Sequence, residues 1–344
     1  MKVLAIETSC DETAAAVVED GRHVLSSVVS SQARMHAGFG GVVPEVASRA
    51  HLEHLGPVVA EALRQSSATS ADLSAVAATV GPGLAGALLV GASAAKAYAW
   101  SWGLPFVGVN HMEGHLHAAF VEGPALALPT VVLLVSGGHT MLVCMQRPPE
   151  ADGGEAGPET VEYRLLGQTV DDAAGEAFDK VSRFLGLGYP GGPAIERAAA
   201  AGSPSAIAFP RGLASAGYDF SFSGLKTSVV RYMRANPSAP LADVAASFQE
   251  AVVDVLSSKA RRAAAQVGAR AICIGGGVAA NTSLRQRIAA VCATDGLRAF
   301  IPSRAMCTDN AAMIGAAAWY RLKMDGPTPL DAPVDPNLAL PLAE

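Results

Sequence analysis

The fold is decided by residues 130–145, which read Thr130-Val-Val-Leu-Leu-Val-Ser-Gly-Gly-His-Thr-Met-Leu-Val-Cys-Met145. The apolar run up to Val135 predicts a buried strand, and Met141 to Met145 predicts a strand that returns beside it. Between them, Gly137-Gly138-His139-Thr140 predicts a tight turn. Such a turn can aim backbone N–H groups at a phosphate or carboxylate, although most β-hairpins bind nothing.

The beginning of the chain repeats this pattern. Lys2 to Glu7 predicts a buried strand, Thr8 to Thr13 a polar turn, and Ala14 to Val18 a returning strand. His23 to Ser30 predicts a third strand, after the hairpin turn Glu19-Asp20-Gly21. A pattern repeated at this separation indicates a duplicated lobe, with the two turns facing each other across a cleft.

Length and composition agree with two lobes. The chain has 344 residues, of which 50% are hydrophobic and 16% charged, so it can build a large core. No apolar run is long enough to span a bilayer, and the charged Glu7 argues against a signal peptide. The five cysteines are widely spread, which favours reduced thiols in a cytoplasmic protein over a disulfide framework.

The net charge of −6 limits how the chain would hold a nucleic acid alone, because phosphate contacts require basic side chains. The basic residues are local. These residues form one patch or, as is commoner, lie on separate solvated helix faces. They are Lys226, Arg231, Arg234, Lys259, Arg261, Arg262, Arg285 and Arg287.

His111 and His115 lie four residues apart, directly after the apolar run Pro105 to Asn110. On a helix they share one face, and two imidazoles placed in this way can hold one metal ion. The alternative is two ordinary polar histidines at a helix start. His51 and His54 also have helical spacing but lack a third ligand, so we expect them on a helix surface.

Several further segments give local predictions. Gly275-Gly276-Gly277 joins a strand to a helix, as in turns that bind adenosine, although a plain tight turn is the alternative. Asp171 to Leu185 predicts an amphipathic helix with an acidic start. Capping residues are expected before two later helices, at Ser223 and at Thr308 or Asp309. Pro57 is expected to kink or divide the helix that begins at Pro44.

Eight motifs occur in an order that closely resembles the bacterial TsaD family, the tRNA adenosine threonylcarbamoyltransferases. The match runs from about Lys2 to Lys323. The motifs are Glu7-Thr-Ser-Cys-Asp-Glu-Thr13, Asn110-His-Met-Glu-Gly-His115, Val135-Ser-Gly-Gly-His-Thr140, Asp172-Ala-Ala-Gly-Glu-Ala-Phe-Asp-Lys180, Tyr189-Pro-Gly-Gly-Pro193, Phe220-Ser-Phe-Ser-Gly-Leu-Lys226, Gly275-Gly-Gly-Val-Ala-Ala-Asn281 and Cys307-Thr-Asp-Asn310.

The resemblance implies a two-lobed α/β fold of the actin-like and sugar-kinase-like (ASKHA) type, with duplicated mixed-sheet lobes around a central cleft. Residues 1–125 plus 309–325 would form the first lobe and 126–308 the second, followed by an extended tail over 326–344. The implied activity transfers a threonylcarbamoyl group from threonylcarbamoyl-AMP to N6 of adenosine 37, in tRNAs that read codons beginning with A.

The resemblance also implies a set of site residues. His111, His115 and Asp309 would bind one iron ion, Fe(2+), with zinc or another divalent metal possible in vitro. Archaeal relatives have a tyrosine ligand at the position of Leu134, which leucine cannot replace. The substrate would contact Leu134, Val135, Ser136, Gly137, Gly138, Asp179, Gly192 and Asn281, together with Glu196, Gly275, Gly276 and Gly277.

Asp11 has two equal interpretations, a catalytic group that orients or deprotonates the attacking amine, or a residue that stabilises its turn. The implied partners are tRNA, a TsaB-like paralogous subunit and a TsaE-like P-loop ATPase, with no membrane. Two other functions stay open. A metallopeptidase would need a base after His111, where Met112 stands, and Glu113 lies about 200° around the helix. A non-catalytic nucleotide-binding scaffold is the second.

Overall fold

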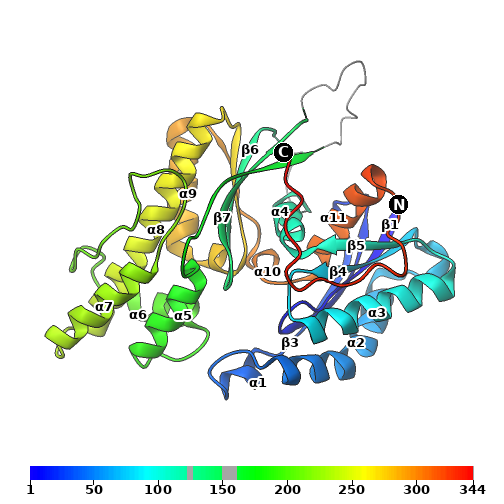
Figure 1. Cartoon of the computed structure of the whole chain (residues 1–344), viewed down its shortest axis with the longest axis horizontal. Coiled ribbons are helices and arrows are strands. Elements are labelled where there is room, and N and C mark those ends of the chain that lie inside the picture. The colour runs from blue at the N-terminus through cyan, green and yellow to red at the C-terminus, as the bar shows by residue number, and fades with distance from the viewer. Residues whose placement is uncertain (122–126, 149–160, 344) are drawn as a thin grey trace. The chain divides into compact units, whose positions relative to one another are not determined.

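The structure is a computed structural model that describes residues 1–121, 127–148 and 161–343. These residues divide into two compact units (Figure 1). Unit 1 comprises residues 1–121 and 308–341, and unit 2 comprises residues 127–148, 161–307 and 342–343. All five cysteines are free thiols, as the sequence predicts. Among the described residues, no helix combines the length and apolar character needed to cross a bilayer.

Unit 1 contains a five-stranded sheet in the order β3-β2-β1-β4-β5. The strands are β1 (Lys2–Glu7), β2 (Glu12–Glu19), β3 (His23–Ser31), β4 (Ala75–Gly81) and β5 (Phe106–Asn110). The first three are antiparallel, and β4 and β5 run parallel to β1. This arrangement confirms the predicted N-terminal hairpins and ends β1, β4 and β5 at one edge of the sheet.

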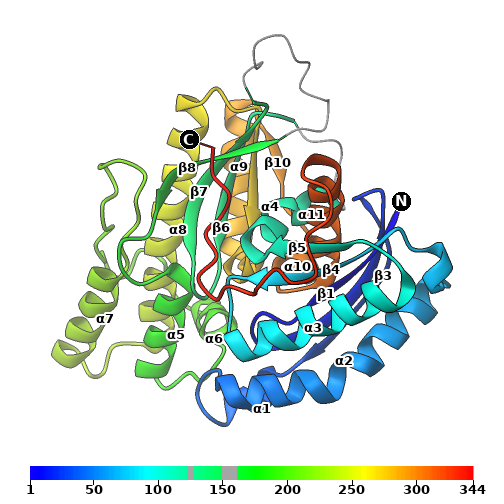
Figure 2. The same cartoon turned by 45° about the vertical axis from the view of Figure 1, so that its right-hand side comes forward.

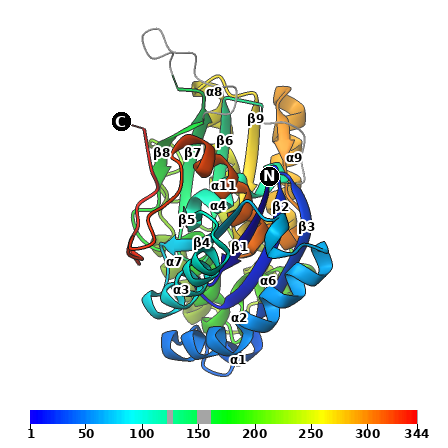
Figure 3. The same cartoon turned by 90° about the vertical axis from the view of Figure 1, so that its right-hand side faces the viewer.

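Both faces of this sheet are covered by helices (Figure 3). Leu4 and Ile6 pack in one core with residues of two helices, and their neighbour Ala5 lies against a third helix at Gly315. The helices are α1 (Ala33–Ala37), α2 (Pro44–Ser66), α3 (Ala85–Trp102), α4 (His111–Val121) and α11 (Ala311–Met324), with a short 3-10 helix at Ser70–Asp72. Pro57 does not divide α2, which continues through it.

Unit 2 repeats the sheet topology of unit 1, in the order β10-β9-β6-β7-β8 (Figure 2). The strands are β6 (Thr130–Val135), β7 (Thr140–Gln146), β8 (Glu162–Gln168), β9 (Ala271–Gly275) and β10 (Arg298–Phe300). Again the first three are antiparallel, and the last two run parallel to the first. The predicted duplication is therefore confirmed strand by strand.

The helices of unit 2 bury the alternate side chains of β6, such as Val131 and Leu133, in one apolar core. They are α5 (Ala174–Phe184), α6 (Gly191–Ala199), α7 (Ser223–Ala235), α8 (Leu241–Gln266), α9 (Thr282–Asp295) and α10 (Arg304–Cys307), with a 3-10 helix at Gly277–Ala280. The fold of the chain is thus α/β, with two mixed five-stranded sheets.

Two helix starts in unit 2 differ from their predictions. Helix α5 begins at Ala174, so Asp171 and Asp172 lie before it. The Asp171 carboxylate accepts hydrogen bonds from the amides of Phe222 and Ser223, and so caps α7 from a distant segment. Ser223 makes no side-chain cap of its own helix. These acidic residues therefore bond to residues far along the chain. Local sequence patterns do not reveal such contacts.

The C-terminal segment after α11 runs along unit 1 without forming a helix or strand (red in Figure 1). The amide of Asp335 donates to the carbonyl of Val80 in β4, and that of Thr328 donates to Phe106 in β5. The Asn110 side chain donates to the carbonyls of Leu338 and Ala339. These bonds tie the segment to β4, to the start of β5 and, through Asn110, to the residue that precedes α4.

Lys259 is fully buried in α8 and fixes a loop of unit 2. Its ammonium donates to the carbonyls of Leu213, Ala216 and Gly217 at 2.8–3.2 Å. Burial and the nearby Arg262 lower its pKa below the usual lysine value. The ammonium binds three carbonyls of one loop at once, so it acts as a structural anchor.

We expect Lys259→Met to lower the free energy of unfolding by roughly 2–3 kcal/mol, because these carbonyls lose their charged donor. Amide hydrogen exchange over residues 211–219 should accelerate. The matched control is Arg261→Met on the same helix, whose exposed ion pair with Asp295 is worth less than about 1 kcal/mol. Equal losses in urea unfolding of the two variants would contradict the anchoring role.

Candidate functional site

His111, His115 and Asp309 converge in unit 1. Nε2 of His115 lies 3.2 Å from Oδ1 of Asp309, and Nε2 of His111 lies 3.5 Å from the same oxygen. Their ligand atoms all fall within 4.8 Å of one another. Two imidazole nitrogens and a carboxylate oxygen form a donor set suited to a transition metal with open positions. These residues therefore fit a metal ion, and the partial exposure of Asp309, 24%, leaves an approach from solvent.

Helix α4 presents both histidines because it starts directly at the end of β5. Oδ1 of Asn110 accepts from the amide of Met112 at 2.9 Å, as an N-cap side chain does. Gly114 lies between the two ligands, and a Cβ there would stand 2.7 Å from Cδ1 of Ile314 in α11. The glycine thus lets α11 approach α4 closely.

Asp309 precedes α11 without capping it, contrary to the local prediction of a cap at Thr308 or Asp309. The N-cap is Asn310, whose side chain accepts from the amide of Met313 at 3.0 Å. The Asp309 carboxylate is therefore available to face the two imidazoles. Glu113 points elsewhere, since its carboxylate binds the guanidinium of Arg321 at 2.8 Å. This ion pair ties α4 to α11 and agrees with the prediction that Glu113 is no protease base.

Glu7 ends β1 as a fully buried carboxylate beside His111. Oε2 lies 3.0 Å from Nδ1 of His111 and accepts from the hydroxyl of Thr79, and Oε1 accepts from the amide of Ser9. Burial alone would raise the pKa of Glu7, but the His111 imidazole outweighs it, and the pKa lies below the usual value. Glu7 is therefore a carboxylate in the folded chain.

The same contacts act on His111. Burial disfavours its charged form, but the carboxylates of Asp309 and Glu7 prevail and raise its pKa to about 9. In the absence of a metal the His111 ring is therefore a charged imidazolium with a proton on each nitrogen. Metal binding must displace one of these protons. His115 has no hydrogen-bond partner at Nδ1 among the described residues, and its ring meets that of His111 edge-on, with centroids 4.7 Å apart.

Asp11 lies in the turn between β1 and β2. Burial, and then the nearby Asp309 carboxylate, raise the pKa of Asp11 above its usual value. The turn is supported by His51, which the sequence places on a surface but which is fully buried. His51 bonds to the hydroxyl of Thr13 at 2.8 Å and to the carbonyl of Cys10 at 3.0 Å. The prediction for His51 was wrong, and that for the exposed His54 is confirmed.

In unit 2, the turn after β6 is the counterpart of this one. The side chains of Leu134 and Val135 are fully buried, so only their backbone can face a ligand. The amide of Ser136 donates to the carbonyl of His139, and its hydroxyl accepts from the His139 amide. The turn is closed by these bonds, and a Cβ at Gly137 or Gly138 would meet nothing within 4 Å. The space beside both glycine α-carbons is therefore open.

The triple glycine lies beside this turn, because Gly275 pairs with Leu134 across β9 and β6. Gly276 has a φ of +83°, and a Cβ there would stand 2.5 Å from the carbonyl oxygen of Val135. Glycine is required at this position for both reasons. Gly277 faces open space and begins the 3-10 helix.

Asp179 and Gly192 belong to α5 and α6. The Asp179 carboxylate accepts from the amide of Gly191 at 2.6 Å, next to Gly192. Burial raises the pKa of Asp179 above its usual value, although the Gly191 amide stabilises its charged form. A Cβ at Gly192 would again meet nothing within 4 Å.

Asn281 and Glu196 meet at the start of α9. Oδ1 of Asn281 accepts from the amide of Leu284, and its amide group donates to Gln249 at 2.8 Å. Glu196 accepts from the amide of Thr282 at 3.0 Å. Both side chains thus fix the helix that follows the triple glycine.

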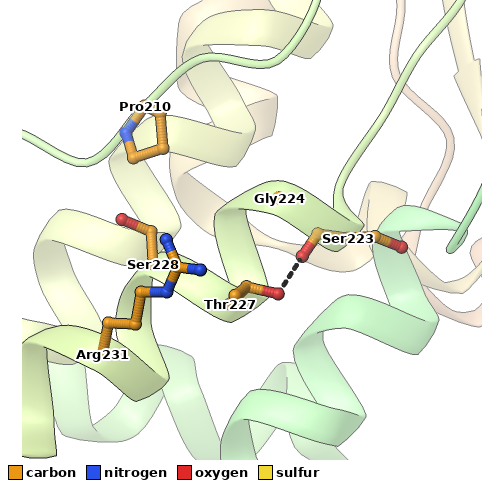
Figure 4. A pocket seen from close by; sticks show the side chains of 6 residues that line it. All are labelled: Pro210, Ser223, Gly224, Thr227, Ser228 and Arg231. Carbon is orange, nitrogen blue, oxygen red and sulfur yellow. Dashed lines mark hydrogen bonds between the residues drawn. The ribbon is translucent and has the colours of Figure 1, made fainter.

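Several basic residues of unit 2 are paired with carboxylates of the same unit. Lys226 pairs with Asp172, Arg261 with Asp295, and Arg287 with Glu250. Arg231 lies instead on the edge of a hollow of about 410 Å³ at the start of α7 (Figure 4). The residues that line this hollow are Pro210, Ser223, Gly224, Thr227, Ser228 and Arg231, and none of them is a predicted site residue.

Sequence reasoning missed two residues of the metal region, Glu7 and His51. A charged residue at the end of an otherwise apolar strand was a signal for Glu7, because a buried charge requires partners. His51 gave no such signal, since its partners come from other elements.

Three solved structures share the fold. The chain has a TM-score of 0.62 to HypF of T. kodakarensis, at 15% identity, over 94% of this chain and 48% of that chain. For a full-length HypF the score is 0.61 at 12% identity, over 95% and 47%. For component A of the (R)-2-hydroxyglutaryl-CoA dehydratase of Acidaminococcus fermentans it is 0.52 at 13% identity, over 94% and 99%. At these identities the likeness shows the actin-like, sugar-kinase-like fold alone.

Sequence relatives are far more similar. Those named tRNA N6-adenosine threonylcarbamoyltransferase include the proteins of Moorella thermoacetica, 50% identical over 98% of this chain and 97% of the relative, and Geotalea uraniireducens, 52% over 94% and 92%. The protein of Corynebacterium diphtheriae is 53% identical over 92% and 91%. The family model described as TsaD: tRNA N6-adenosine threonylcarbamoyltransferase matches residues 23–316. The chain therefore belongs to the TsaD family.

Proposed function

We propose that the chain transfers the threonylcarbamoyl group of threonylcarbamoyl-AMP to N6 of adenosine 37, in tRNAs that read codons beginning with A. The observation that carries the proposal is membership of a family of named transferases, at about half identity over nearly the whole chain. Such an enzyme would work in the cytoplasm, where its tRNA substrates are.

The chemistry is acyl transfer from an activated mixed anhydride to a weakly nucleophilic amine. The amine nitrogen bonds to the carbamoyl carbon, AMP leaves, and the amine loses a proton. Because the donor is already activated, the protein mainly aligns the reactants and excludes water, which can contribute roughly 7–11 kcal/mol.

Unit 2 would hold the adenylate. The amides of Gly137 and Gly138 would donate to the phosphate or acyl oxygen, and the open space beside these glycines supports this role. Gly276 and Gly277 allow a ligand to lie against the backbone, with Asp179, Gly192, Asn281 and Glu196 around it. Ser136 supports these donors without joining them, since its own amide is bonded within the turn.

In unit 1, His111, His115 and Asp309 would hold one iron ion. Two histidines and one carboxylate form the donor set typical of non-haem Fe(II) sites. When bound, such an ion polarises and orients a substrate oxygen. Asp11 would accept the proton that the amine loses, which its raised pKa favours.

A metallopeptidase is disfavoured by the contact that Glu113 makes. A general base beside the metal would need a free carboxylate on the ligand face of α4, whereas Glu113 is bonded to Arg321. The scaffold alternative is disfavoured by the complete ligand triad, which a merely structural subunit would have no need to keep.

A TsaB-like paralogous subunit and a TsaE-like P-loop ATPase would act together with this chain. The net charge of −6 and the internal pairing of unit 2 cations support shared tRNA binding. In unit 1, exposed apolar side chains, among them Leu52 and Leu89, line a hollow of about 550 Å³ between α2 and α3. An exposed apolar patch of this kind is typical of a protein interface and supports a protein partner.

We expect His111→Ala and Asp309→Ala each to remove bound metal and tRNA modification together. Loss of a direct ligand should cost more than the 10–100-fold in metal affinity that loss of an outer partner costs. Metal content of the purified proteins and modified adenosine in tRNA, by mass spectrometry, provide the measurements. The control is His23→Ala, an exposed histidine of the same unit. Unaltered modification in either ligand variant would refute the assignment.

Incubation of the chain with threonylcarbamoyl-AMP and unmodified tRNA separates the three functions. We expect threonylcarbamoyl-adenosine in the tRNA once both partner subunits are present, and its loss on treatment with a chelator. Release of peptides from a protein substrate would favour the metallopeptidase. A complete assembly that forms product equally well with Asp309→Ala would favour the scaffold.

A further inference from the structure

Glu7 occupies a position where a carboxylate is costly for the fold. It ends the apolar strand β1, its side chain is fully buried, and its neighbours in the strand are Ala5 and Ile6. A buried carboxylate lowers stability unless it is fully bonded, and a well-packed apolar residue is often as good or better for the fold. The fold itself therefore does not explain a glutamate here.

The bonds of Glu7 are aimed at one imidazole. The amide of Ser9 donates to Oε1 and the hydroxyl of Thr79 donates to Oε2, so two donors fix the orientation of the carboxylate. Oε2 then accepts from Nδ1 of His111 at 3.0 Å, and the hydroxyl of Ser9 lies 3.1 Å from the same nitrogen. With Nδ1 occupied by this hydrogen bond, Nε2 of His111 faces Asp309.

His115 provides an internal comparison. Its Nδ1 is buried and has no hydrogen-bond partner among the described residues. Its Nε2 faces Asp309 at 3.2 Å, and its ring lies edge-on against His111. Of the two imidazoles, His111 is thus the one whose Nδ1, the nitrogen that faces away from Asp309, is held by a carboxylate.

We propose that Glu7 is a positioning residue for the metal site, which holds His111 with Nε2 directed at the metal. The proposal rests on the metal-dependent function proposed above. A carboxylate that accepts from the far nitrogen of a ligating histidine fixes its tautomer and raises its basicity. Glu7 touches neither the metal nor the substrate, so its effect passes through His111.

The experiment measures Co²⁺ binding to the full chain by competition with a chromophoric chelator. We expect Glu7→Gln to weaken Co²⁺ binding about 10–100-fold. At saturation, the visible absorption bands of bound Co²⁺ should shift, because the released imidazole changes the ligand geometry. Thr79→Val keeps the Glu7–His111 bond but loosens the carboxylate, so its loss of affinity should be smaller and in the same direction.

The matched control is Lys259→Met, which lowers stability through unit 2 and should leave both Co²⁺ affinity and spectrum unchanged. A role of Glu7 in stability alone would make Glu7→Gln behave like this control, which would overturn the proposal. If Glu7→Gln does not fold, wild-type affinity in Thr79→Val overturns it instead. A wild-type chain that binds neither Co²⁺ nor Fe²⁺ would overturn the metal site itself, which is a different failure.

Discussion

The candidate metal site depends on the close contact between α4 and α11. This contact brings His115 and Asp309 together although 194 residues separate them in the chain. Gly114 leaves room for this contact, because a Cβ there would stand 2.7 Å from Cδ1 of Ile314. The ion pair between the buried Glu113 and the half-buried Arg321 then links the two helices. A small shift of either helix would move a ligand out of reach, since metal–ligand distances tolerate only about 0.2 Å.

The duplicated sheet topology gives the two units equivalent turns with different chemistry. In unit 1 the turn after β1 is filled by protein groups. The Thr8 hydroxyl bonds to the carbonyl of Ala87, Gly91 makes room for it, and His51 holds the Cys10 carbonyl. In unit 2 the equivalent turn ends in two glycines that face open space. One copy of the pattern therefore supports metal ligands, while the other leaves open space beside its backbone.

Several charged groups in this chain make structural contacts within their own unit. Lys259 binds the carbonyls of a loop, Asp171 caps α7, and Asp172 pairs with two lysines. Glu7 differs from these residues, because its carboxylate bonds to His111 rather than to a helix end or a loop.

Much of the fold could be predicted from the sequence because local patterns of apolar residues and glycines specify it. Strand periodicity and glycine turns gave the paired hairpins, and the motif series gave the residues of the site. Capping and burial could not be predicted in this way. Asn310 rather than Asp309 caps α11, and His51 lies inside rather than on a surface. Both outcomes depend on partners from elements distant in sequence. By itself the sequence determined the duplicated hairpins and the family. Only the tertiary structure decided which side chains are free to bind a ligand, because that depends on which polar groups are already bonded.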